Sequence, residues 1–176
     1  RPTIHSTGMT AGAPDRGSEP LAARIRPGSR HPGRVNPSVR AALFGFVGAE
    51  DRAMGNLAET AVWSQWLHDT STSHSLHYAR WKSGRQDLEV DIVSLDPRTQ
   101  KPRFAVEIKW SDRIPHQLQE LRGIKALASR HPLARRPLVT TRTYTGTADL
   151  DGVPVEFAPV ALHCYTIARN LLRFRT

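Results

Sequence analysis

Three stretches of the chain repeat hydrophobic residues every three or four positions, which predicts helices with one apolar side. Within residues 51–68 these positions are Met54, Leu57, Ala58, Ala61, Val62 and Trp66. After Asp112 they are Leu118, Leu121, Ile124, Leu127 and Ala128. This second helix should run to about residue 130, because a His-Pro pair follows it. A closing helix is predicted over residues 159–170. A further short helix is predicted to begin at Asn36-Pro37, because asparagine caps helix N-termini and proline suits the first helical position.

Between these helices, β-branched and aromatic residues predict strands. Three of them are consecutive, over residues 75–81, 88–95 and 103–110, and the segment DPRTQKP forms a turn between the last two. Further strands are predicted over residues 137–144 and 153–157. The resulting element order is αβββαβ with trailing elements. We therefore expect an α/β fold with a central mixed sheet flanked by helices.

The second and third predicted strands carry charged residues within an otherwise apolar sequence. Strict alternation would place Glu89 and Asp91 on one face of their strand, and Glu107 and Lys109 on the matching face of the next strand. The opposite face would then be apolar in both strands. A hairpin with its polar side in water is the simplest explanation of this pattern.

Two observations favour a functional site instead. The chain uses only four lysines among 25 basic residues, so a lysine at position 109 suggests a need for a compact ammonium group. In addition, Asp91 and Glu107 lie on neighbouring predicted strands, at positions whose side chains should point to the same face of the sheet. Mg²⁺ is usually coordinated by one or two carboxylates, and water and phosphate oxygens complete its coordination shell. Asp91 and Glu107 could supply the carboxylates, the backbone carbonyl of Ile108 a further oxygen, and Lys109 could orient a water or stabilise phosphoryl charge.

Glu107, Ile108 and Lys109 begin sixteen positions after Asp91. This arrangement resembles the active-site motif of the PD-(D/E)XK (restriction-endonuclease-like) nuclease superfamily, whose core has the same αβββαβ order. The segments RVNPSVRAALFG, GNLAETAVWSQWL, LHYARW, LEVDIVSL and FAVEIKWSD also resemble the C-terminal domain of unknown function of bacterial and archaeal AAA-type ATPases. That similarity covers roughly residues 34–170.

The resemblance implies a nuclease-like domain that hydrolyses nucleic-acid phosphodiesters, with Mg²⁺ or Mn²⁺ as cofactor. It implies that Glu59 joins Asp91, Glu107 and Lys109 as a catalytic residue, and that Glu59 adds a carboxylate to the metal site. An ordinary exposed helix acid is the alternative for Glu59. Glu89 is expected to support the lysine rather than to bind the metal.

The chain departs from this pattern in two ways. Val90 stands where the superfamily name places proline, and no GxxxxGK[ST] phosphate loop occurs in the sequence. The resemblance therefore implies a fragment or a shortened relative of such an ATPase. A second hypothesis is a non-catalytic recognition or regulatory module with the nuclease fold that serves an ATPase domain. A plain protein-interaction domain is a third.

Charge and composition refine this picture. The formal net charge is +9, and residues 1–40 hold seven arginines against Asp15 and Glu19. This balance favours nucleic acid as a partner, with DNA preferred.

Residues 1–35 are rich in proline and glycine and predict a mobile basic lead-in, so we expect one domain over residues 36–176. The apolar run 41–49 is too short for a membrane span, and the single cysteine, Cys164, suits a cytoplasmic protein.

Three further features have less specific interpretations. His74 and His77 fall on opposite faces of a predicted strand, which disfavours a shared metal. The arginine-rich segment 129–137 could bind a phosphate backbone or form a solvated loop. The four tryptophans, Trp63, Trp66, Trp81 and Trp110, are expected in the core.

Overall fold

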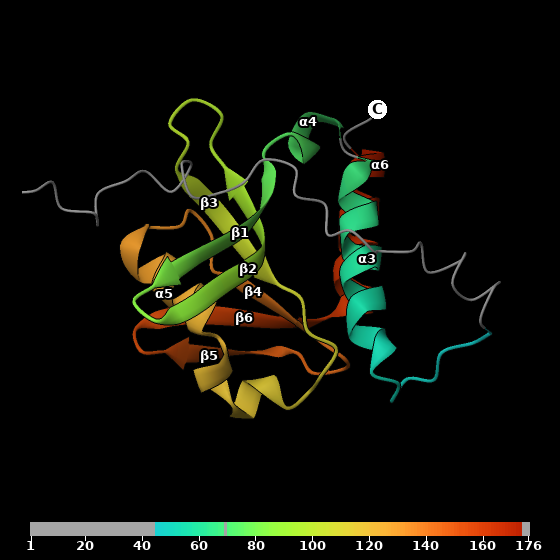
Figure 1. Ribbon diagram of the computed structural model, residues 1–176. Helices are drawn as coiled ribbons and strands as arrows, with labels where there is room; N and C mark the ends of the chain where they lie inside the picture. The colour runs from blue at the N-terminus through green and yellow to red at the C-terminus, as the bar shows by residue number, and fades with distance from the viewer. Residues whose placement is uncertain (1–44, 69, 174–176) are drawn as a thin grey trace, which may run out of the picture.

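The computed structural model describes residues 45–68 and 70–173, with the side chains of residues 70 and 71 left out. Helices and strands follow one another in the order shown in Figure 1. They are α3 (Ala53–Leu67), α4 (Thr70–Ser73), β1 (Leu76–Ser83), β2 (Gln86–Leu95), β3 (Pro102–Glu107), α5 (Arg122–Arg130), β4 (Leu138–Thr141), β5 (Gly146–Leu150), β6 (Val153–Pro159) and α6 (Val160–Arg173). Two short 3-10 turns, Ile114–His116 and Leu118–Glu120, precede α5.

The strands form one mixed sheet in the order β1-β2-β3-β4-β6-β5. The first three strands are antiparallel neighbours, β4 runs parallel to both β3 and β6, and β5 pairs antiparallel with β6. Helices α3 and α6 lie side by side over one face of the sheet, and α5 lies on the other (Figure 1). The α/β class and the mixed sheet flanked by helices are confirmed.

Each face of the sheet has its own apolar cluster. On the α5 face, Ile124 and Leu127 of the helix pack with Val90, Val93 and other strand residues. On the other face, Ala58 and Val62 of α3 and Val160 of α6 pack with Ile92 and Val106. The described chain therefore forms a three-layer structure with a sheet that is buried on both sides.

Close approach of α5 to β2 depends on Gly123. A Cβ atom at this position would lie 1.9 Å from the backbone oxygen of Glu89. Any side chain there would push the helix away from the strand. Gly123 thus lets the beginning of α5 sit directly over the strand that carries the predicted acids.

A β-bulge in β2 overturns the predicted alternation. His77 pairs with Val93 and Ala79 pairs with Val90, so one residue of β1 faces two residues of β2. Val90 and Val93 consequently share the α5 face, while Ile92 points to the other face. Strict alternation along residues 88–95 would have placed Val90 and Val93 on opposite faces, and it is wrong here because the extra residue reverses the parity of the strand.

Several predicted boundaries also differ. β3 ends at Glu107 instead of residue 110, and the helix predicted after Asp112 becomes α5 only at Arg122. Pro115 lies in the first of the intervening 3-10 turns, which use different hydrogen bonds from an α-helix. The sequence pattern also missed β5 and α4.

The remaining sequence predictions have mixed outcomes. The helices predicted over residues 51–68 and 159–170 are confirmed as α3 and α6. Trp81 is buried, and Trp63, Trp66 and Trp110 pack against the core as predicted. The helix start at Asn36 and the lead-in over residues 1–35 lie outside the described residues.

Candidate metal-binding carboxylate site

Asp91 and Glu107 lie on neighbouring strands, and both side chains are nearly inaccessible, with 8% and 6% of their surfaces exposed. Asp91 sits in the β2 bulge, and Glu107 is the last residue of β3. The backbone N–H of Ile108 donates a 2.7 Å hydrogen bond to Oδ2 of Asp91. One carboxylate oxygen of Asp91 therefore fixes the backbone at Ile108, the residue directly after Glu107.

Lys109 forms an ion pair within this site. Its Nζ lies 2.8 Å from Oε1 of Glu107. The second oxygen of Glu107, Oε2, is buried and has no hydrogen-bond partner in the protein. A buried carboxylate oxygen without a partner is destabilising, so a cation or a proton on Oε2 of Glu107 would be favourable.

Thr140 holds the backbone of Lys109 from the other side. The ladder between β3 and β4 ends at Glu107 and Val139, and Thr140 is the next residue of β4. Its Oγ1 accepts a hydrogen bond from the N–H of Lys109 at 2.9 Å and donates one to the carbonyl of Lys109 at 3.0 Å. Thr140 is fully buried. Its side chain thus continues the sheet contact by one residue and sets the direction of the lysine.

Two further acids surround the pair. Glu59 is half-buried on α3, and its charge acts on Asp91. Glu89 is exposed on β2, accepts a 2.6 Å hydrogen bond from the hydroxyl of Tyr78, and acts electrostatically on Asp91, Glu107 and Lys109. The structure therefore brings all four predicted catalytic residues into one electrostatic group, with Glu89 at its exposed side.

Burial and the neighbouring charges change the proton affinities of the site. Burial raises the pKa of Asp91 to about 6; the Ile108 hydrogen bond opposes this shift, and the charge of Glu59 adds to it. Burial and the charge of Asp91 raise the pKa of Glu107 to about 7. Burial acts to lower the pKa of Lys109, but the charge and hydrogen bond of Glu107 together with the charges of Asp91 and Glu89 raise it overall. Burial is the largest cause of both carboxyl shifts and the neighbouring acids add to it, so both groups hold their protons more tightly than free carboxyl groups do.

These residues fit a hard divalent cation in part. The unpartnered oxygen of Glu107 and the carboxylate of Asp91 are the ligand type that Mg²⁺ and Mn²⁺ prefer. Within residues 45–68 and 70–173, however, no three His, Cys, Asp or Glu side chains are grouped to hold a metal by themselves. Two protein carboxylates with the rest of the shell from water or substrate is the usual arrangement for Mg²⁺. The Ile108 carbonyl remains a predicted ligand.

Other parts of the site were not foreseen from the sequence. Thr140 and Tyr78 carry no signal of their own, because threonine and tyrosine are ordinary strand residues. Only the sheet register brings Thr140 next to Lys109.

No protein-family model, curated protein or solved structure matches the chain. None of the helices in the described ranges has the length and apolar character needed to cross a membrane.

Proposed function

We propose that the protein is a metal-dependent nuclease-like domain that hydrolyses phosphodiesters of nucleic acids, DNA in particular. The observation that carries the proposal is the buried Asp91 and Glu107 pair beside Lys109, with one oxygen of Glu107 left without a protein partner. In this proposal Asp91 and Glu107 hold Mg²⁺ or Mn²⁺ with the carbonyl of Ile108 as an additional ligand, and Glu59 acts on the site through its charge on Asp91. The PD-(D/E)XK resemblance of the same residues supports this assignment.

Each protein group has a distinct task in the proposed site. Lys109 places a fixed positive charge beside the carboxylates, where it would stabilise negative charge on a phosphoryl group in the transition state. Asp91 and Thr140 hold the backbone on either side of Ile108, so the lysine and the carboxylate of Glu107 keep their relative position. The metal, when bound, would make a coordinated water more acidic and polarise the phosphate.

Nucleic acid is the substrate class that the charge distribution favours. The chain carries a net charge of +9, while the site itself is acidic. A basic protein attracts a polyanion, and an acidic site would repel it unless divalent cations bind there first. Binding of the substrate phosphate is therefore expected to depend on the metal.

The test is cleavage of labelled single-stranded and double-stranded DNA and RNA by the full chain, with Mn²⁺ or Mg²⁺ added. Glu107→Gln should lower cleavage at least about 100-fold, because it removes a charged ligand without changing side-chain size. Glu120→Gln is the matched control, since Glu120 pairs with Arg113 at the surface. Cleavage by Glu107→Gln at the wild-type rate would rule out the proposal.

A second candidate function has its own supporting observation. Because no group of three ligating side chains is present in the described chain, the site also suits a non-catalytic recognition or regulatory module of an ATPase. Such a module would show no rise in melting temperature with Mg²⁺ or Mn²⁺. A metal site stabilises the folded state by mass action, so a metal-dependent rise that Glu107→Gln abolishes favours the nuclease.

A further inference from the structure

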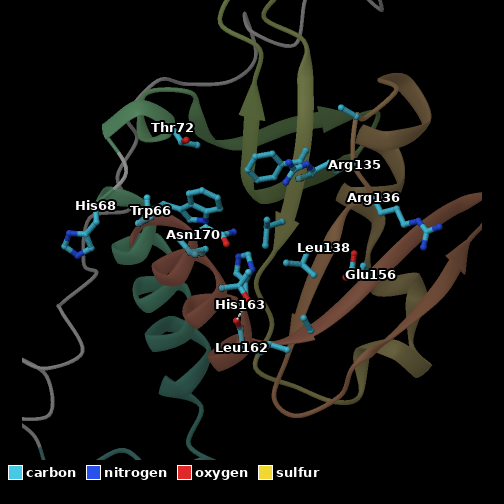
Figure 2. A pocket seen from close by; sticks show the side chains of 18 residues that line it. Trp66, His68, Thr72, Arg135, Arg136, Leu138, Glu156, Leu162, His163 and Asn170 are labelled. Carbon is cyan, nitrogen blue, oxygen red and sulfur yellow. Dashed lines mark hydrogen bonds between the residues drawn. The ribbon is translucent and has the colours of Figure 1, made fainter. Parts of the chain in front are cut away.

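A second candidate site lies over the β3-β4-β6 part of the sheet, beside α3 and α6 (Figure 2). It is an open cavity of about 1140 Å³, bordered by both helices, by these strands and by the segment between α5 and β4. None of the four proposed catalytic residues lines it. The cavity is therefore separate from the carboxylate site, and its ligand can be inferred independently of the proposed nuclease function.

Two of the cavity-lining side chains have a buried nitrogen without a protein partner. These are Nε1 of Trp66 on α3 and Nε2 of His163 on α6. Among the described residues, the only other buried side-chain atom in this condition is the Glu107 oxygen of the carboxylate site. An indole N–H can only donate, so Trp66 requires an acceptor that the protein does not provide. The histidine is uncharged at neutral pH, because burial lowers its pKa to about 4, and it can donate or accept.

Aromatic rings form part of the cavity wall. The ring centroid of Trp66 lies 5.8 Å from that of Phe104 and 6.4 Å from that of His163, with tilted planes in both pairs. Leu138 and Ile167 add aliphatic surface. Such a wall suits an aromatic body, because a further ring can pack against the tilted rings already present.

One cation reaches toward these rings. In Figure 2 the side chain of Arg135 extends toward the side of the cavity that holds Trp66, whereas Arg136 extends away from it. Arg135 has no ion-pair partner in the described part of the chain. A guanidinium group binds carboxylate and phosphate with two parallel hydrogen bonds. The cavity thus combines an apolar aromatic wall with the unpaired positive charge of Arg135, and Glu156 is the acidic side chain in its lining.

We propose that this cavity binds a small aromatic anion, which places its ring against Trp66 and Phe104 and its carboxylate or phosphate on Arg135. Carboxylate and phosphate share the chemistry that Arg135 recognises, so the test must separate them.

The test monitors the four indole N–H resonances in ¹⁵N–¹H spectra of the full chain. Trp66→Phe identifies the resonance of Trp66 by its loss. The probes are phenyl phosphate and phenylacetate, with inorganic phosphate and benzyl alcohol as the charge-only and ring-only controls. We expect a saturable shift of the Trp66 resonance with one or both aromatic anions, and about tenfold weaker binding of both controls, which is a loss of about 1.4 kcal/mol. The tighter of the two anions identifies the preferred head group.

Arg135→Ala and Arg136→Ala form a matched pair of variants, because both side chains are exposed and neighbouring in sequence. Arg135→Ala should weaken binding of the aromatic anion about tenfold, and Arg136→Ala should leave it unchanged. Equal effects of the two variants would overturn the proposal. So would equal movement of all four indole resonances, or no shift of Trp66 with any probe.

Discussion

The carboxylate site and the Trp66–His163 cavity both leave buried polar atoms without protein partners, but they differ in charge. The carboxylate site gathers acids around Lys109, and its electrostatics favour a cation. The cavity has an apolar aromatic wall and an arginine without an ion-pair partner among the described residues, and it favours an aromatic anion. One fold thus presents two different unmet requirements, and the nature of each requirement indicates the chemistry of its ligand.

The largest effect is expected at Asp91, where two substitutions separate its proposed role as a metal ligand from its hydrogen bond to the Ile108 N–H. Asp91→Ala should lower metal-dependent cleavage about 100-fold or more, and should lower the free energy of unfolding by about 1–3 kcal/mol, because the Ile108 N–H loses its acceptor. Asp91→Asn can still accept that hydrogen bond, so it should lower cleavage alone. Cleavage assays and urea unfolding measure the two effects. Equal destabilisation by both substitutions would contradict the structural role.

The two regions should respond to pH with opposite signs. His163 has a folded pKa of about 4, below its ordinary 6.5, so the unfolded chain binds the proton first as the pH falls. The free energy of unfolding should therefore drop between pH 6.5 and 4, by about 3 kcal/mol. Glu107 has a folded pKa of about 7, above its ordinary 4.5. Its contribution is present at low pH and is lost as the pH rises through 7.

Single substitutions isolate these contributions in metal-free buffer. His163→Phe should remove the loss of stability on acidification, whereas Glu107→Gln should remove the loss on raising the pH to 8. Urea unfolding at several pH values compares each variant with the wild type. Parallel pH curves for the wild type and both variants would show that neither group titrates with the inferred shift.

A smaller effect is expected at Thr140. Thr140→Val keeps the buried volume but leaves the N–H and C=O of Lys109 without their side-chain partner, so the free energy of unfolding should fall by about 1–3 kcal/mol. Metal-dependent cleavage should fall as well, since the lysine loses its position. Thr140→Ser, which retains the hydroxyl, is the control and should recover most of the cleavage. Equal cleavage by the valine variant and the wild type would show that the lysine is positioned by other contacts.

The smallest effect is expected at the surface. Arg113 pairs with Glu120 at 3.1 Å, but 61% and 38% of these side chains are exposed. Arg113→Ala should change the free energy of unfolding by no more than about 1 kcal/mol and should leave cleavage unchanged. Thermal melting in low and high salt checks this. A larger loss would mean that exposed ion pairs matter here as much as the Glu107–Lys109 pair, whose carboxylate is buried.

The sequence predicted the carboxylate site better than the cavity for a physical reason. Charged residues inside apolar strands are conspicuous, so Asp91, Glu107 and Lys109 could be selected from the pattern alone. Trp66 and His163 lie on helices at positions that suit a core, and nothing in the sequence marks a nitrogen that lacks a partner. The proximity of Arg135 depends on how the segment between α5 and β4 folds back, which periodicity does not encode.

The fold was predictable to a similar degree. Long periodic segments such as α3 and α6 were located within three residues at each end. The bulge in β2 was missed, because it depends on backbone pairing across two strands and not on side-chain type. β5 was missed because its sequence, GTADL, contains glycine and aspartate, which are uncommon in strands. Its pairing with β6 overrides that local preference.

The bulge also couples folding of the hairpin to assembly of the carboxylate site. Val90 and Val93 are three positions apart, and the extra residue between them lets both contact the same apolar cluster. A hairpin without the bulge would send one of these valines to the opposite face, into the cluster beneath α3 and α6. Core packing on both faces therefore favours the pairing in which Asp91 meets the end of β3.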